Sequence, residues 1–295
     1  MGTIKKIGYA TFETSDVDRL SEYYQEVLGL AVQARARDAV FLSCPLDHHS
    51  VVLRKGPQAD CTQLGLEVAS DDDLSELQRR LASRGIVASE ATDPAPSVER
   101  RISFAGPGKF TIEVQAEASI QDLEMSRDAI RPLRLGHVAF KVSDVNATVK
   151  FFCDLLEFRE SDWIGDFFAF LRCGPEHHTV NFLNNPDQRM HHIAFQLRDV
   201  EHIKKACDYL GRRRVPLIWG PGRHGPGHNI FTYHHNPDGH IIELYAELDQ
   251  MSDETLGYFD PRPWHREFPQ RPRVWEPGLD TSNCWGIPGP SSFRD

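Results

Sequence analysis

The sequence predicts an α+β fold in which four βαβββ modules pair into two domains, followed by an extended C-terminal arm. The main observation is an internal duplication. Residues 1–120 and 130–250 repeat the same order of motifs, at an offset that drifts only from 128 to 130 residues. Each half also contains two smaller units, and each unit opens on an apolar strand that leads into an amphipathic helix. The last segment, 251–295, has a different composition.

The best-matched pair of stretches shows how a module begins. IGYATFETSDVDRLSEYYQEVLGL at 7–30 corresponds to LGHVAFKVSDVNATVKFFCDLLEF at 135–158. Both contain a strand pattern, a Ser-Asp-Val turn and an amphipathic helix, and serine and aspartate are common helix N-caps. The second module of each half opens on a strand at 64–69 or 191–197.

Two segments fall outside the modules. Residues 118–131 are predicted to link the two halves, and residues 251–295 to form an ordered arm laid over the body. Frequent proline in the arm argues against regular helix and central strand. Trp264, Trp275 and Trp285 need burial, which favours an ordered arm over a disordered one.

Composition and charge exclude several classes of function. The formal net charge is −10, so neither nucleic acid nor an anionic membrane is expected as a partner, because both require a basic face. No apolar stretch approaches the ~20 residues that span a bilayer, and the N-terminus reads as a strand rather than a signal peptide. We therefore expect a cytoplasmic protein whose six scattered cysteines are free thiols.

Three positions could hold a metal, and two of them distinguish the two halves. The second half has His137, His192 and Glu243 where the repeat places Tyr9, Gln63 and Glu113 in the first half. Two imidazoles and one carboxylate form the set that binds non-haem Fe(II) and leaves coordination positions open. The set of candidate ligands therefore exists once, although the scaffold exists twice.

Strand parity predicts which of two adjacent histidines faces the interior. In GHVAF and in HHIAF the candidate histidine precedes alanine by two residues and phenylalanine by three. Because side chains alternate along a strand, His192 should face the same side as His137. His191 should point the other way, either outward or as a residue that supports the ligands. A lone histidine in a strand is more often a core group than a ligand, so the prediction depends on all three positions being in register, with an inward carboxylate that needs a partner.

These residues resemble the type I extradiol ring-cleavage dioxygenases of the catechol 2,3-type, within the vicinal oxygen chelate (glyoxalase-like) superfamily. The resemblance covers residues 1–250 and is most specific at GPGRHGPGHNIFTYHHNPDGHIIELYAE, residues 220–247. It implies two vicinal-oxygen-chelate-type domains, a metal-free one at 1–120 and a catalytic one at 130–250. It also implies that His137, His192 and Glu243 are the metal ligands.

The resemblance further implies a reaction and its catalytic residues. The family opens the ring of a catechol-type diol with O₂ in aromatic-compound degradation, using Fe(II), with Mn(II) as the runner-up metal, and usually forms homo-oligomers. His178 corresponds to its acid–base residue, a role that suits the pKa of histidine. Tyr233 and His224 correspond to hydrogen-bond donors to the reacting oxygens.

Some of these assignments leave alternatives open. His177 adjoins His178, and His48 and His49 stand at the same place in the metal-free half, so the pair can exist for structural reasons. Ala139, Pro226 and Gly227 depart from the family pattern and put the substrate in doubt. Residues expected at the pocket walls are Phe170, Trp163 and Trp219, and those expected in a turn or on the surface are His234, His235 and His240.

Two other functions fit the same scaffold. Glyoxalase-type isomerases and epimerases, and thiol transferases, commonly use zinc, nickel or manganese and draw ligands from paired units. A fourth ligand is then expected on the strand after His178, whose sequence TVNFLNN offers no inward acid or histidine. A metal-free small-molecule-binding protein is the third possibility, and it predicts that His137→Ala leaves ligand binding intact.

Overall fold

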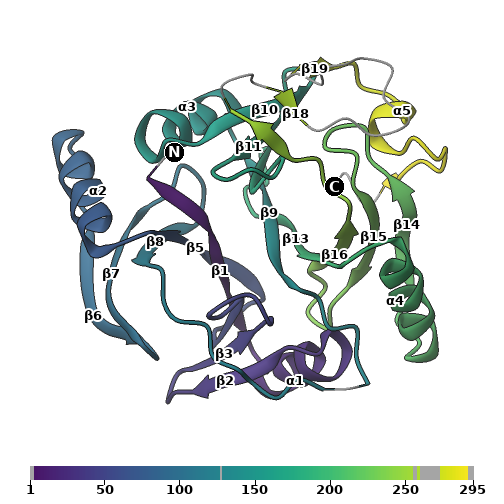
Figure 1. Cartoon of the computed structure of the whole chain (residues 1–295), viewed down its shortest axis with the longest axis horizontal. Helices are drawn as coiled ribbons and strands as arrows, with labels where there is room; N and C mark the ends of the chain where they lie inside the picture. Colours follow the sequence, from purple (N-terminus) through teal and green to yellow (C-terminus); the bar gives the residue numbers. More distant parts are fainter. Residues whose placement is uncertain (1–2, 127, 255–257, 260–272, 292–295) are drawn as a thin grey trace.

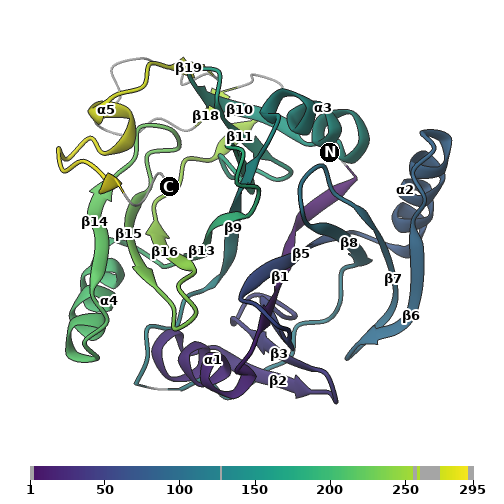
Figure 2. The same ribbon diagram turned by 180° about the vertical axis from the view of Figure 1, so that it is seen from behind.

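Each half of the chain forms one large mixed β-sheet, and the two sheets lie side by side (Figures 1 and 2). The computed structural model describes residues 3–126, 128–254, 258–259 and 273–291. The strands β1 of the first sheet and β9 of the second run close together in the middle of the molecule. The N-terminal and C-terminal halves are thus packed as one body.

The first sheet has the strand order β2-β3-β4-β1-β5-β8-β7-β6. Its module boundary lies between β1 and β5, which pair antiparallel, whereas β1–β4 and β5–β8 are parallel. The elements of this half are β1 (Ile4–Thr14), α1 (Val17–Tyr23), the π-helix η1 (Tyr24–Leu28), β2 (Ala31–Arg35), β3 (Ala39–Ser43), β4 (Val51–Lys55), β5 (Asp60–Val68), α2 (Asp71–Ser83), β6 (Ser89–Ala95), β7 (Val98–Ala105) and β8 (Thr111–Ala116).

The second sheet repeats this arrangement, with the order β14-β15-β16-β13-β9-β12-β11-β10-β19. Here β9 and β13 form the antiparallel pair at the module boundary. Its elements are β9 (Arg134–Val142), α3 (Val145–Leu156), β10 (Arg159–Ile164), β11 (Phe168–Arg172), β12 (Val180–Asn184), β13 (Met190–Gln196), α4 (Val200–Arg212), β14 (Leu217–Arg223), β15 (Ile230–His235) and β16 (Ile241–Ala246). The predicted α+β fold of four βαβββ modules is confirmed.

The helices begin where the repeated turn predicts. In both matching turns the capping side chain is the aspartate: Asp16 accepts a hydrogen bond from the backbone N–H of Arg19, and Asp144 from that of Ala147. Such a bond satisfies one of the backbone donors that a helix leaves unpaired at its first turn. The same local sequence therefore starts the first helix of each half.

Apolar and polar contacts hold the two halves together. The rings of Phe110 and Phe140 stack across the junction with centroids 4.1 Å apart. The hydroxyl of Tyr23, in α1, lies 2.6 Å from Nε2 of His234, in β15. His234 is fully buried, so its predicted surface position is wrong. Alternation along β15 explains the error, since Tyr233 faces the sheet's concave side and His234 the opposite one.

The C-terminal arm covers one end of the second sheet (Figure 1). Its described elements are β17 (Met251–Asp253), β18 (Tyr258–Phe259), β19 (Val274–Trp275) and the short helix α5 (Leu279–Ser282). The strand β19 extends the sheet edge beside β10, a position that tolerates neighbouring prolines. The prediction that the arm contains no regular helix is wrong at α5, whose four residues include no proline.

The expected burial of the arm's tryptophans is only partly met. Trp275 is half-buried, whereas Trp285 is 51% exposed and lies beside the guanidinium of Arg223. Trp264 lies outside the described residues. None of the helices in the described part of the chain is both long and apolar enough to cross a membrane.

Candidate active site

Three neighbouring strands of the second sheet carry the three candidate metal ligands. His137 lies on β9, His192 on β13 and Glu243 on β16, and β13 is hydrogen-bonded to both of the other strands. Ala194 of β13 pairs with His137 on one side and with Glu243 on the other. Its small side chain lets both longer side chains converge in front of it.

The side chains of these residues meet at one point. Nε2 of His137 lies 3.2 Å from Nε2 of His192, and the two nitrogens lie 3.0 and 3.1 Å from Oε2 of Glu243. Two metal bonds of about 2.1 Å at a right angle separate their donor atoms by about 3.0 Å. The three atoms therefore fit one triangular face of an octahedral metal site, the geometry of the two-histidine, one-carboxylate set.

Burial and charge favour this site for a cation. All three side chains are almost fully buried, and burial lowers the pKa of His137, keeping it neutral and able to ligate. Burial alone would raise the pKa of Glu243, but His137 and His192 outweigh it and hold that pKa well below its usual range. A buried carboxylate that stays ionised is a favourable metal ligand.

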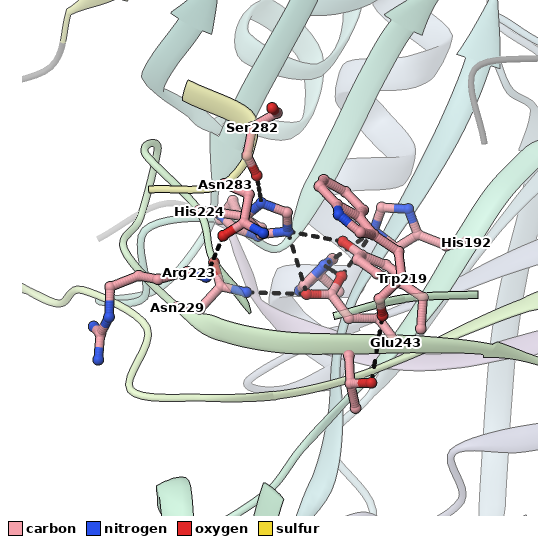
Figure 3. A network of polar contacts seen from close by, with 12 residues as sticks. His192, Trp219, Arg223, His224, Asn229, Glu243, Ser282 and Asn283 are labelled. Atoms are coloured by element: carbon pink, nitrogen blue, oxygen red, sulfur yellow. Dashed lines mark hydrogen bonds and ion pairs between the residues drawn. The ribbon is translucent and has the colours of Figure 1, made fainter. Parts of the chain in front are cut away.

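A further residue contacts the candidate ligands and was not predicted. The amide Nδ2 of Asn229 donates to Oε1 of Glu243 at 3.0 Å, which fixes the carboxylate (Figure 3). The alternation of side chains along the strand could have predicted this contact. Asn229 precedes Tyr233 by four residues and therefore faces the same side of the sheet. The glycine-rich sequence before Asn229 hid the start of the strand.

His191 also lines the cavity, so the outward orientation is wrong, and its contact with His192 fits the alternative of a residue that supports the ligands. The register of β13 against β9 passes from Met190↔Phe140 to His192↔Ala139, which leaves His191 as the extra residue of a β-bulge. A bulge breaks the strict alternation of side chains. Nδ1 of His191 lies 2.7 Å from Nδ1 of His192, where it can orient that ring.

The two adjacent histidines before β12 face different surroundings. His178 lines the cavity, with its ring centroid 4.4 Å from that of His137. Nε2 of His177 lies 3.1 Å from the carboxylate of Asp162. Burial lowers the pKa of His178 well below its ordinary value, and His137 and His177 lower it further.

His224 and Tyr233 form a connected pair at the cavity wall. Nε2 of His224 lies 2.9 Å from the hydroxyl of Tyr233. Nδ1 of His224 lies 2.7 Å from the carbonyl oxygen of Ser282 in α5 (Figure 3). The carbonyl can only accept, so Nδ1 carries the proton and Nε2 accepts from Tyr233. Burial lowers the pKa of His224 to about 4, which keeps the ring neutral near pH 7.

A cavity of about 710 Å³ opens in front of these side chains. Phe170 and Trp219 line it as predicted, whereas Trp163 packs against the apolar core and donates its indole N–H to Glu160. The arm closes one side, with Leu279 and other residues of 277–290 among the lining. Other described lining residues that sequence reasoning missed include Ile164, Phe167, Phe168, Asn181 and Leu183.

The equivalent place in the first half is filled by a side-chain cation. The hydroxyl of Tyr9 donates to Glu113 at 2.6 Å, and Gln63 donates to the other carboxylate oxygen at 3.0 Å. Arg101 is buried, bonds to Glu113 at 3.3 Å and lies over the ring of Tyr9. The guanidinium of Arg101 thus balances the charge of Glu113, the counterpart of Glu243.

The chain is similar in sequence and in fold to known proteins. The chain is 24% identical to an iron-dependent extradiol dioxygenase from Rhodococcus jostii, over 86% of this chain and 92% of that protein. It is 22% identical to a manganese-dependent 2,3-dihydroxybiphenyl 1,2-dioxygenase from Geobacillus genomosp. 3, over 95% and 99%. The crystal structure of a Mn(II)-bound glyoxalase from Novosphingobium aromaticivorans superposes with a TM-score of 0.86 at 25% identity, covering 99% of this chain and 94% of the other.

These similarities confirm the resemblance that the motifs indicated. Residues 6–114 and 134–244 each match one family, and together they cover most of the chain. The two matched segments correspond to the two sheets, one with the arginine-filled site and one with the histidine and glutamate cluster. The chain therefore belongs to the Glyoxalase/Bleomycin resistance protein/Dioxygenase superfamily.

Proposed function

We propose that this protein is an Fe(II)-dependent extradiol dioxygenase, which cleaves the ring of a catechol-type diol with O₂ in the degradation of aromatic compounds. The observation that carries the proposal is the cluster of His137, His192 and Glu243 at the base of a cavity that His178 and Tyr233 also line. Only one face of a metal would be covered by protein, and a diol and O₂ require the positions left open.

The metal would be held by the two imidazole nitrogens and one oxygen of Glu243. When bound, it supplies Lewis acidity that favours the ionised diol, together with the redox capacity to activate O₂. Asn229 and His191 support the proposal, since they would keep Glu243 and His192 in position. Manganese is the alternative metal, because this ligand set does not separate Mn(II) from Fe(II).

His178 would take the proton that the diol must lose. In this step an O–H bond of the diol breaks, an N–H bond forms on Nε2 of His178, and the electron pair stays on the diol oxygen. The lowered pKa of His178 supports a ring that is neutral before the transfer. The proton can return during ring opening, which makes the residue both base and acid.

Tyr233 would donate a hydrogen bond to oxygen as negative charge develops. Burial first, and Glu243 second, raise the pKa of Tyr233 well above its ordinary value, so the hydroxyl keeps its proton. His224, fixed by the carbonyl of Ser282, would accept the hydrogen bond of this hydroxyl until a substrate binds. The hydroxyl would then turn its one proton from Nε2 of His224 to the substrate oxygen, where a hydrogen bond to developing charge is stabilising.

The cavity walls support a substrate larger than a single ring. About 710 Å³ lies within the range of pockets for drug-sized ligands, ~300–1,000 Å³. Phe168, Phe170 and Trp219 offer aromatic surface on which a ring or its substituent can pack. The same apolar surface excludes water from the reacting atoms.

A glyoxalase-type isomerase is the second candidate, because one similar crystal structure is a Mn(II)-bound glyoxalase. Asn181 argues against it. Glu243 pairs with Ala194, which lies two residues after His192 on β13. In the other module Asn181 takes the equivalent place, because it pairs with Ala139, which lies two residues after His137 on β9. The position that mirrors Glu243 thus holds an amide, a poorer ligand than a carboxylate and no proton acceptor.

Metal-loaded protein can decide between these functions. Protein loaded anaerobically with Fe(II) or Mn(II) should convert a simple or an aryl-substituted catechol, on addition of O₂, into a yellow ring-opened product. A hemithioacetal should remain unchanged under the same conditions. Metal binding without conversion of any catechol would contradict the proposal, and turnover of the hemithioacetal would establish the isomerase.

A further inference from the structure

The adjacent histidines His177 and His178 connect the cavity to a buried carboxylate. They are 1% and 3% exposed, and their Nδ1 atoms lie 3.0 Å apart. His178 turns its ring toward the cavity, whereas Nε2 of His177 lies 3.1 Å from Oδ2 of Asp162. The order of contacts from the cavity outward is therefore His178, His177, Asp162.

The charge at one end of this chain determines where the protons lie. The carboxylate of Asp162 lies at ion-pair distance from Nε2 of His177, without an aligned hydrogen bond, and its negative charge favours the tautomer of His177 with the proton on that nitrogen. Nδ1 of His177 then carries a lone pair and accepts the proton on Nδ1 of His178. Nε2 of His178 is consequently left with its lone pair and can accept a proton in the cavity.

Asp162 is itself held in a fixed orientation. It lies on β10, is 5% exposed, and accepts a hydrogen bond from the backbone N–H of Arg273 at 2.9 Å and one from the indole N–H of Trp275 at 2.6 Å. Both donors belong to the segment around β19 of the C-terminal arm. The arm thus contacts the residue at the end of the histidine chain.

The first half has the same histidine pair without the carboxylate. Nδ1 of His48 lies 2.7 Å from Nδ1 of His49, and both rings are buried. Asp162 pairs with Phe170 on the neighbouring strand, and the residue that pairs with the equivalent Phe41 is Ala34. Two adjacent histidine rings can therefore pack without a carboxylate at the position of Asp162. That carboxylate is present in the half with the candidate metal ligands, where the other half has alanine.

We propose that Asp162 is a positioning residue that acts through His177 to keep the proton of His178 on Nδ1. Nε2 of His178 then meets the diol as a proton acceptor. The chemical role rests on the proposed function, because the diol supplies the proton. The tautomer itself does not depend on that function and can be measured without a substrate.

Nitrogen NMR of histidine-labelled, Zn(II)-loaded full-length protein reads the tautomer directly. The signals of His178, assigned by their loss in His178→Gln, should show a protonated Nδ1 and a bare Nε2. Asp162→Asn should shift the proton of His178 toward Nε2, whereas Glu160→Gln, an acid-to-amide change on the same strand, should leave it in place. A protonated Nε2 in the wild type, or an unchanged tautomer in Asp162→Asn, would overturn the proposal.

Kinetics with the Fe(II)-loaded enzyme test the consequence. Asp162→Asn should lower kcat by about 10-fold or more, with KM and metal content unchanged, because general-base catalysis is typically worth 10²–10⁴-fold. In a His178→Asn background it should cost nothing further. Full kcat in Asp162→Asn, or additive losses, would overturn the positioning role.

A second variant keeps the proposal testable if Asp162→Asn does not fold. Trp275→Phe retains the acid but removes one of its hydrogen bonds, so kcat should fall by a smaller factor and a minor fraction of His178 should change tautomer. An unchanged tautomer together with unchanged kcat would argue against the proposal. If no diol is turned over, the NMR measurement still decides the tautomer and separates failure of this inference from failure of the proposed function.

Discussion

The two neighbouring histidines of β13 have different relations to the candidate metal. Nε2 of His192 lies 3.1 Å from Oε2 of Glu243 and 3.2 Å from Nε2 of His137. The other ring nitrogen of His192, Nδ1, lies 2.7 Å from Nδ1 of His191. If Nε2 of His192 gives its lone pair to a metal, its Nδ1–H donates to His191. One residue would then be a ligand and the other its support.

This difference predicts graded losses of metal affinity. His192→Ala removes a ligand and should abolish tight metal binding, whereas His191→Ala should weaken it by roughly 10–100-fold, as is typical for residues that orient a ligand. Calorimetric titration of apoprotein with Fe(II) or Zn(II) measures both, and His235→Ala, at an exposed histidine, is the control. Equal losses in the two variants would contradict the assignment.

Sequence reasoning identified individual residues best where the duplication offered a comparison. Comparison with the first half identifies His137 and His192, which have no histidine counterpart there, and the structure brings both together with Glu243. His191 could not be oriented correctly, because a bulge depends on pairing with β9 and leaves no local pattern. The contact of Ser282 with His224 joins residues 58 positions apart and also could not be predicted.

At the scale of elements, the strands of the first half hold Tyr9 where the second half has the candidate ligand His137. Gly65 of β5 stands where β13 has Ala194, and it pairs with Tyr9 on one side and Glu113 on the other. A Cβ at Gly65 would overlap the ring carbons of Tyr9. The absence of that Cβ lets the ring lie over β5 and its hydroxyl reach Glu113.

This packing predicts that Gly65→Ala destabilises the protein. Overpacking of a filled core costs about 1–3 kcal/mol, so the free energy of unfolding in urea should fall by that order. The matched control is Gly211→Ala in α4, where a Cβ meets nothing within 4 Å, and this change should stabilise by about 0.5–1 kcal/mol. A Gly65→Ala variant as stable as the wild type would argue against the proposed role of Tyr9.

Regular elements were more predictable than the arm. The period of apolar residues and the Ser-Asp-Val turns indicated the strand and helix order in both halves, because those signals are local. The edge strand β19 and the helix α5 depend on contacts with distant elements. For example, the side chain of Asn283 accepts from the backbone N–H of Arg223 and donates to the carbonyl of Ile287. Composition alone does not encode such contacts.

At the scale of the whole molecule, a buried carboxylate joins the two halves. Oδ2 of Asp47, in the first half, accepts hydrogen bonds from Ser50 and from the backbone N–H of Leu135 at the start of β9. Lys6 lies 3.7 Å away. Burial raises the pKa of Asp47 from 3.8 to about 6, although these partners oppose the shift.

The raised pKa predicts a pH-dependent stability. Between about pH 4 and pH 6 the folded protein retains a proton on Asp47 that the unfolded chain has lost, so the contribution of Asp47 to stability falls as pH rises through this window. The Asp47→Asn variant has no carboxyl group at this position and therefore lacks this pH-dependent contribution to stability. Its stability relative to the wild type should therefore rise from pH 4 to pH 6, by on the order of 2 kcal/mol.

Urea unfolding of the two apoproteins at several pH values gives this difference directly. Comparison at each pH cancels the buried histidines, whose lowered pKa values make stability rise with pH in both proteins. A difference that stays constant from pH 4 to pH 6, or that favours the wild type as pH rises, would contradict the account of Asp47.

The central claim is that the cluster of the second sheet uses O₂ to open the ring of a diol. The most direct measurement is the consumption of ¹⁸O₂ by Fe(II)-loaded protein with a catechol, followed by mass spectrometry of the product. We predict that one O₂ is consumed per diol, that both labelled atoms enter a ring-opened product, and that His192→Ala abolishes the reaction. A metal-loaded protein that consumes no O₂ with any catechol, or a product that retains an intact ring, would contradict the claim.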